Sequence, residues 1–554
     1  MRLRPAAFLS VLVAASLVLV GCTGDVDLDT EPTTFATTPA AQAVAVAQAP
    51  VNPTTLFASS DPTELALNAS RTFFASAQVA VLAPAGDQPD TVRAASIAMT
   101  LGVPVLLAGA DDAALDAELL RLGVGTIVPV GAVPLDGIDT TSLTVQPAPA
   151  DTADLSALLG LDLADAPTAA QGQEVPALAA LAGGQVFTTS DQAALNTTPP
   201  AASGQMPVTE PAEQVQGTVA VADGDPAQSA AVGTARAAGA QVVIVSGDPR
   251  ASADAVTRLG EAGATSIVGL GTTFGDEAQF AWRTATAATG VQLPGGGQLV
   301  FPGKRYVALY GSPHTASLGV LGEQGVDATV QRAADTAAPY QALTPDTVIP
   351  ALEIIVTVGT GGAGEDGNYS EEWGVEGFIP LIEAAQAAGQ YVVLDLQPGR
   401  SSFLDQIKLY ESLLQYPNVG VALDPEWRLG PNQVHLVQNG HVGIDEVNSV
   451  VTYLADFVQA NHLPQKLIIM HQFQLRMIDG RERLDTSRTE VALLIHADGQ
   501  GSQGAKADTW DALHVGAPAG VYWGWKNFID EDVPMLTPEQ TYQVVPIPDF
   551  VSYQ

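Results

Sequence analysis

Two carboxylates stand close together at the end of an apolar run. The segment 419–427 reads VGVALDPEW, so Asp424 and Glu426 follow apolar residues at a spacing of two. Residues two apart on a strand point to the same side, so both carboxylates can face one cavity. Because a nearby carboxylate raises the pKa of its partner, one of the two can stay protonated as a general acid. The pattern predicts Glu426 as a proton donor and Asp424 as the group that tunes it.

A third carboxylate, Asp395, ends the preceding apolar run, YVVLDLQ. Paired carboxylates on either side of a sugar perform glycoside hydrolysis, and we expect Asp395 to be the second member of the pair. Trp427, Trp523 and Trp525 offer flat faces on which sugar rings could stack. The sequence therefore predicts cleavage of a glycosidic bond. The alternative is a surface protein that binds glycan without cleaving it.

Similar polar groups end most of the strands expected in the second half of the chain. Apolar runs at 306–311, 353–359, 391–397, 419–427, 466–473, 490–499 and 520–528 alternate with helical stretches at 377–388, 403–414 and 444–461. This alternation predicts a TIM-type (β/α) barrel with an eighth strand that we cannot place, and such barrels hold their active sites at the C-terminal strand ends. The predicted substrate-binding residues are the groups at these ends: Tyr310, His314, Gln397, Trp427, His471, His496, Asp498, Trp523 and Trp525.

A metal site is the rival interpretation of the same residues. His471, His496 and Asp498, with Asp424, could coordinate a divalent cation on adjacent strands. The sequence contains neither an HxH nor an HExxH pair around these residues. We therefore predict no metal and no cofactor.

The Asp-x-Glu at positions 424 and 426 resembles that of family 18 chitinases and family 25 lysozyme-like muramidases. The resemblance covers this strand end and the barrel pattern. It implies a glycan substrate in a cell wall or an extracellular polysaccharide.

An internal repeat occupies the first half of the chain. Residues 79–131 and 219–271 each read as strand, helix, strand, helix and strand. Apolar strands that alternate with Ala-rich helices predict Rossmann-like βαβ units with a parallel sheet. No G-x-G-x-x-G follows the first strand of either copy, so a nucleotide site is not indicated.

The repeat resembles the cell wall-binding repeat 2 module of Gram-positive surface proteins. The matching stretches are Gly102–Leu107 and Leu122–Gly131, with a weaker copy at 239–271. The family usually has three tandem units, whereas this chain has two clear copies separated by residues 132–217. The resemblance implies noncovalent attachment to a cell-wall polymer.

The only cysteine follows a short N-terminal apolar stretch. Arg2 and Arg4 precede the apolar residues that lead to Leu19-Val20-Gly21-Cys22. This resembles a bacterial lipobox, which implies that residues 1–21 are a signal peptide and that Cys22 is lipidated. The protein would then be anchored to the outer face of the cytoplasmic membrane by acyl chains. The alternative is an ordinary secretory signal with an incidental cysteine.

Composition separates two halves and excludes one class of partner. The net charge is −38, which argues against nucleic acid, because binding phosphate needs a basic surface. All seven histidines and all five lysines lie at or after residue 304. We predict a tether at 22–62, a wall-binding α/β region at 63–300 and a glycosidase-like barrel at 303–554.

Overall fold

The computed structural model describes residues 42–188 and 200–554. The predicted signal peptide, residues 1–21, and the predicted lipidation site, Cys22, lie outside this range. The described chain is mixed α/β and contains parallel sheets and a closed parallel barrel. Within it, no helix combines the length and the apolar character needed to cross a membrane.

The first repeat folds into the five predicted elements. They are β4 (Val79–Pro84), α2 (Gln88–Leu101), β5 (Val105–Ala108), α3 (Asp112–Leu122) and β6 (Thr126–Pro129). Asp87 and Asp111 cap the helix N-termini, and Gly102 and Gly123 end the helices with positive φ, as left-handed C-caps require. With β7 (Thr144–Val145), the strands form a parallel sheet in the order β5-β4-β6-β7.

The second repeat has the same strand order. Its elements are β11 (Thr218–Ala222), α6 (Ser229–Ala237), β12 (Gln241–Ile244), α7 (Ala253–Glu261) and β13 (Ser266–Leu270), followed by α8 (Glu277–Ala287). The parallel sheet runs β12-β11-β13-β2. Helices α2 and α6 pack so closely that a Cβ on Gly233 would overlap Ala95. One apolar core therefore joins the two copies.

Part of the predicted tether is folded. Strand β1 (Gln42–Ala47) pairs with β10 (Val208–Glu210) and β3 (Phe74–Ala77), and β2 (Thr54–Phe57) pairs with β13. Ala43 and Ala45 are buried on one face of β1. Alternation between small residues leaves little hydrophobic contrast, which is why the sequence did not reveal these strands. Helices α1 (Pro62–Phe73), α4 (Thr152–Leu159) and α5 (Glu174–Ala180), with β8 (Ala164–Asp165) and β9 (Gln185–Val186), complete this half.

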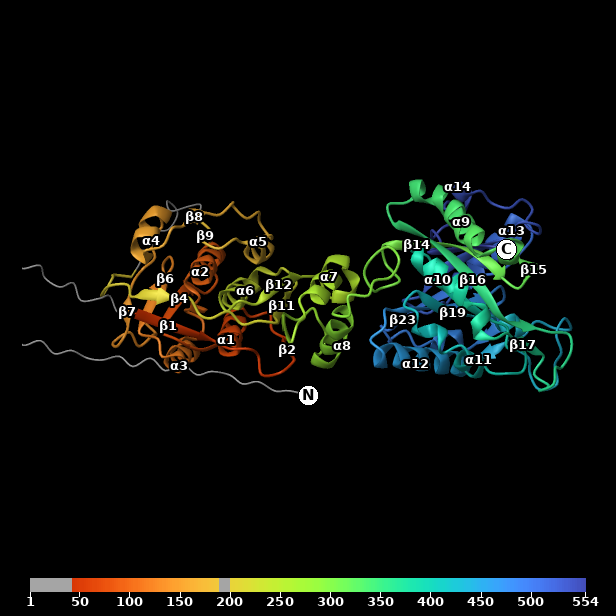
Figure 1. Ribbon diagram of the computed structural model, residues 1–554, viewed down its shortest axis with the longest axis horizontal. Coiled ribbons are helices and arrows are strands. Elements are labelled where there is room, and N and C mark those ends of the chain that lie inside the picture. The colour runs from red at the N-terminus through yellow and green to blue at the C-terminus, as the bar shows by residue number, and fades with distance from the viewer. Residues whose placement is uncertain (1–41, 189–199) are drawn as a thin grey trace, which may run out of the picture. The chain divides into compact units, whose positions relative to one another are not determined.

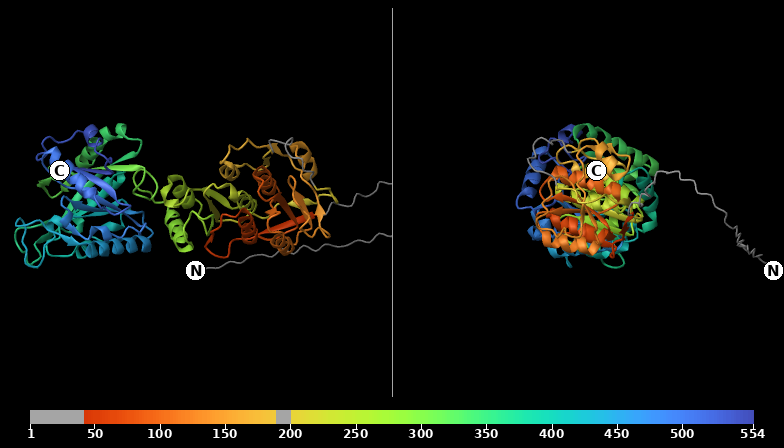
Figure 2. Two further views of the ribbon diagram at one scale, coloured as in Figure 1. Left: turned by 180° about the vertical axis from the view of Figure 1, so that it is seen from behind. Right: turned by 90° about the vertical axis from the view of Figure 1, so that its left-hand side faces the viewer.

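The second half contains a closed barrel of eight parallel strands (Figure 1; from the opposite side, Figure 2, left). Seven strands are those predicted: β14 (Lys304–Ser312), β16 (Thr347–Gly359), β18 (Tyr391–Leu396), β19 (Val419–Leu423), β21 (Lys466–Gln472), β23 (Val491–Ala497) and β24 (Tyr522–Asn527). The eighth is β25 (Phe550–Tyr553), which lies between β24 and β14. Pairing of β14 with β16 closes the ring.

Helices lie outside the barrel. They are α9 (Val326–Ala337), α10 (Ile379–Ala387), α11 (Phe403–Leu409), α12 (Ile444–Ala460), α13 (Gln503–His514) and α14 (Pro538–Thr541). The three helical stretches expected from the sequence correspond to α10, α11 and α12. Between β21 and β23 the chain forms only short 3₁₀ turns and β22 (Ile478–Asp479), so the alternation of strand and helix is interrupted there.

Alternate residues of each barrel strand belong to two different cores. Val307, Leu352 and Val421 pack with helix residues in the outer core. Their strand neighbours, including Tyr306 and Ala351, form a smaller core inside the barrel. Tyr306 contacts Tyr391 and Phe550 there, with ring centroids 5.3 and 6.4 Å apart. This aromatic layer fills the N-terminal end of the barrel and leaves the C-terminal end for polar groups.

Candidate active site

The inward-facing positions change from apolar to charged along the barrel strands. Tyr391 and Val393 of β18 lie in the inner core, and Asp395 is the next residue on the same side. The same step of two leads from Ile469 to His471 on β21. Register also pairs His471 with His496, and Glu353 with Tyr310, so polar groups on neighbouring strands lie side by side.

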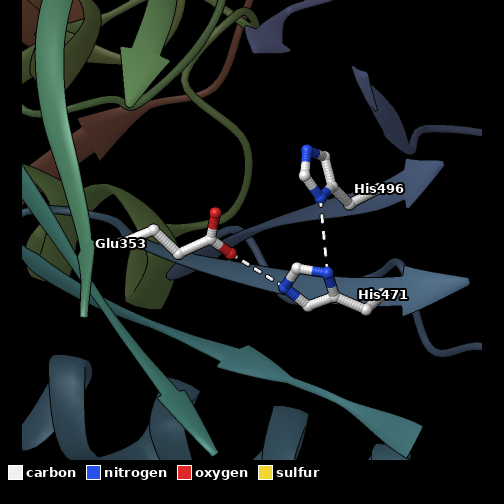
Figure 3. Close-up of side chains that lie close together, drawn as sticks. All are labelled: Glu353, His471 and His496. Atoms are coloured by element: carbon white, nitrogen blue, oxygen red, sulfur yellow. Dashed lines mark hydrogen bonds and ion pairs between the residues drawn. The ribbon is translucent and has the colours of Figure 1, made fainter. Parts of the chain in front are cut away.

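His471 lies at the centre of a buried polar cluster (Figure 3). Its Nε2 donates to Glu353 Oε1 at 2.8 Å, and its Nδ1 donates to Asp498 Oδ2 at 3.0 Å. The Nδ1 atoms of His471 and His496 are 3.4 Å apart, and His496 Nε2 is 3.3 Å from Ser552 Oγ. Every ring nitrogen of the two histidines therefore has a polar partner.

The two histidines have opposite protonation. Burial disfavours the charged form of His471, but the carboxylates of Glu353 and Asp498 outweigh it and hold its pKa well above the ordinary value. Burial lowers the pKa of His496 to about 3, and repulsion from the His471 cation acts in the same direction. The arrangement is a buried imidazolium next to a neutral imidazole.

A second set of charges lies beside this pair. Lys526 Nζ is 3.1 Å from Asp498 Oδ1 and 3.6 Å from the centroid of the Tyr310 ring. Burial opposes ionisation of Asp498, but Lys526 and His471 lower its pKa below the ordinary value. Tyr310 donates to Asp395 Oδ2 at 2.8 Å. Burial nevertheless raises the pKa of Asp395 to about 6.

A cavity of about 630 Å³ opens above these groups. Tyr310, Gln397, Asp424, Glu426, Trp427, Asp498 and Lys526 are among its lining residues. Burial, together with Asp395, raises the pKa of Asp424 well above its ordinary value. Burial, together with Asp498, also raises the pKa of Glu426. The cavity thus presents an ionised carboxylate, Asp498, and two carboxyl groups that retain their protons to higher pH.

The predicted pair Asp424 and Glu426 does line one cavity, but not by strand alternation. Strand β19 ends at Leu423, and Asp424 caps a 3₁₀ turn, Pro425–Trp427, by accepting from the Glu426 backbone N–H at 3.3 Å. The turn carries Glu426 into the cavity. Besides burial, the charge of Asp498 raises the pKa of Glu426.

Several predicted site residues lie outside the cavity. Asp395, His471 and His496 are fully buried beneath it. The rings of Trp523 and His514 are stacked, with their centroids 3.5 Å apart, and Trp525 is buried against Trp510. His314 packs against Trp373 and Phe378.

Strand parity explains the placement of the β24 residues. Gly524 is opposite His496 on the inner side, where a Cβ would overlap the histidine ring. Lys526 is two residues further on the same side, so Trp523 and Trp525 must point outward. The predicted sugar-stacking role of these two tryptophans is therefore not supported, and Trp427 is the tryptophan that lines the cavity.

Two residues of the buried polar cluster, Glu353 and Lys526, were not predicted from the sequence. Glu353 is a fully buried charge inside an apolar strand, and Lys526 follows two tryptophans. A charged residue in an otherwise apolar strand is itself a signal, since burial of an unpaired charge is costly.

Among residues 42–188 and 200–554, one group could hold a metal: Glu353, His471 and His496, whose ligand atoms lie within 4.8 Å of one another. Asp424 and Asp498 of the rival interpretation are not in this group. Both ring nitrogens of His471 are already hydrogen-bonded to carboxylates. A metal bound by His471 would have to displace one of these hydrogen bonds.

No protein-family model matches the sequence, and no curated protein matches it. Among solved structures, the chain is similar to Cwp6 from Clostridium difficile, with 14% identity, a TM-score of 0.33, and coverage of 63% of this chain and 66% of Cwp6. It is also similar to Cwp8 from Clostridium difficile, with 13% identity, a TM-score of 0.30, and coverage of 44% and 52%. The chain thus spans just under two thirds of Cwp6 and about half of Cwp8. Similarity at this level assigns no activity and no ligand.

Proposed function

We propose that the barrel hydrolyses glycosidic bonds of a cell-wall or extracellular polysaccharide, with Glu426 as general acid. The observation that carries the proposal is the pair of cavity-lining carboxyl groups with pKa values shifted in opposite directions, upward for Glu426 and downward for Asp498. Two carboxyl groups whose pKa values differ in this way can act as acid and base in one reaction.

Each residue then has a defined task. Glu426 donates its proton to the oxygen of the leaving sugar, and the ionised Asp498 acts on the opposite side as base or nucleophile. Asp498 replaces the predicted Asp395, because Asp395 is fully buried and does not line the cavity. Lys526 and His471 keep Asp498 ionised.

The test is hydrolysis of purified cell-wall glycan and chitin-like oligosaccharides by the full chain. Glu426→Gln preserves the shape and removes the acidic proton, so we expect the rate to fall by about 10²–10⁴-fold, with glycan binding retained. Glu482→Gln is the matched control, because Glu482 is exposed and does not line the cavity. An active wild type with an equally active Glu426→Gln variant would exclude this general acid. Binding without turnover by the wild type would instead favour the non-catalytic alternative.

We also propose that the protein is an envelope lipoprotein, anchored through Cys22 and bound to wall polymer through residues 63–300. The support is the lipobox-like sequence at 19–22 and the resemblance of the repeat to cell wall-binding modules. Both would hold the barrel close to a wall substrate.

A further inference from the structure

A second, smaller cavity adjoins the first at Glu426. Its volume is about 240 Å³, and it shares Glu426, Trp427 and Leu436 with the larger cavity. A general acid protonates the oxygen that joins two sugar units. Under the proposed function, Glu426 therefore lies where the bond between two occupied subsites would lie.

Apart from Glu426 and Trp427, the residues that line the smaller cavity belong to one loop, residues 428–440, whose two ends are joined by hydrogen bonds. Gly440 N donates to Glu426 O at 2.7 Å, and His441 N donates to Arg428 O at 3.2 Å. Arg428 also forms an ion pair with Glu446 of α12, with Nε 3.1 Å from Oε1. His435 Nε2 lies 3.0 Å from Tyr369 O, which ties the loop to the neighbouring segment. These contacts hold the loop beside the general acid.

Leu436 at the loop tip has an unfavourable conformation. Its φ is +64°, in the left-handed region that disfavours a residue with a Cβ. Its side chain is 90% exposed, so no burial within the chain compensates for this conformation. Tyr369, which contacts the loop through its carbonyl, also has a positive φ, of 65°. Such residues cluster at ligand-binding sites.

The lining of the smaller cavity matches a neutral sugar. Trp427 and Leu436 offer apolar surface to a ring face, and Gln438 and Asn439 offer amide groups to its hydroxyls. Glu426 is the one carboxylate among the lining residues, and none of them is Lys or Arg. We propose that this cavity is a second sugar subsite, so that the cleft binds one polysaccharide chain on both sides of Glu426 and cuts within it. The proposal rests on the proposed function.

The test measures binding separately from turnover. Chitin-like oligosaccharides from disaccharide to hexasaccharide are titrated calorimetrically into the full-length Glu426→Gln variant. We expect affinity to rise with chain length until both subsites are filled. Leu436→Gly, added to Glu426→Gln, should weaken binding of the longest oligosaccharide by about tenfold, the effect of losing a partly buried leucine contact, and weaken disaccharide binding less. In the active wild type, early products should be long fragments.

The variants are chosen to retain the fold. Glycine and asparagine both tolerate a positive φ, so Leu436→Gly and Leu436→Asn remove the apolar contact without adding strain. His462→Gly is the matched control, because His462 also has a positive φ, of 48°, and lies outside both cavities.

Three results would overturn the proposal: affinity independent of chain length, a Leu436→Gly effect equal for all lengths, or no binding at any length. Failure of the proposed function would look different, because the wild type would show no turnover while the chain-length series still reported on the subsite.

Discussion

Asp395→Asn tests the electrostatics of the barrel without depending on the proposed reaction. Asp395 is fully buried, and its Oδ1 has no hydrogen-bond partner. Burial raises its pKa from 3.8 to about 6 in the folded state. Asparagine has nearly the same shape, can still accept the Tyr310 hydrogen bond, and carries no charge. The substitution therefore removes the ionisation and little else.

The sign of the pH dependence of stability follows from proton binding at Asp395. Between pH 3.8 and about 6 the folded state binds more protons at Asp395 than the unfolded state does, so wild-type stability falls as pH rises through this range. A shift of about two pKa units corresponds to about 3 kcal/mol, and about 2 kcal/mol of it develops between about pH 4.5 and pH 8. Relative to wild type, Asp395→Asn should gain this amount of stability over that interval.

The assay is denaturant unfolding of the full chain, followed by tryptophan fluorescence at several pH values. Five of the six tryptophans lie at or after Trp373, so the signal reports on the barrel. Asp508→Asn, at an exposed position of α13, is the control for the loss of one carboxylate. A difference for Asp395→Asn that stays constant, or falls with rising pH, would refute the raised pKa.

Three further predictions concern the rest of the chain. Cys22→Ser should release the protein from membranes into the medium, as checked by fractionation; a cleaved variant that stays membrane-bound would exclude the lipid anchor. A fragment of residues 42–300, which includes β1 and β2, should fold by circular dichroism and sediment with purified cell walls; a folded fragment left in the supernatant would exclude wall binding. Chelation with EDTA should leave glycan hydrolysis unchanged, and a loss restored by one added divalent metal would favour the cluster of Glu353, His471 and His496 as a metal centre.

The sequence predicted the strands with strong apolar contrast and missed those without it. Seven predicted strands are found in the closed barrel, and parallel strands are found in both segments 79–131 and 219–271, because apolar runs alternate there with distinct helical segments. β25 is four residues long, and only the four-residue helix α14 lies between it and β24, so no distinct helical segment marked it. In β1, Ala43 and Ala45 are buried and the Val residues that follow them are exposed. Because Ala and Val differ little in polarity, the sequence shows no clear alternation of apolar and polar residues there.

The site was predictable in position but not in detail. The rule that strand ends carry the site led to Asp424, Glu426, Trp427 and Asp498, all of which line the cavity. This rule could not distinguish the inward-facing from the outward-facing residues of β24, because aromatic and polar residues occur on both sides of the strand. It also treated Asp395 as accessible, whereas this residue is completely buried.

The charge balance of the cluster explains why one residue is suited to donate a proton. Five carboxyl groups face two cations, His471 and Lys526; the carboxyl groups are those of Glu353, Asp395, Asp424, Glu426 and Asp498. The two cations lower the pKa values of Glu353 and Asp498 despite burial, so these two carboxylates stay ionised and neutralise them. The other three have no cation left to balance them, and burial raises their pKa values. Of these three, only Glu426 is more than marginally exposed in the cavity. The excess of acid over base thus favours a proton on Glu426, a carboxyl group that lines the cavity.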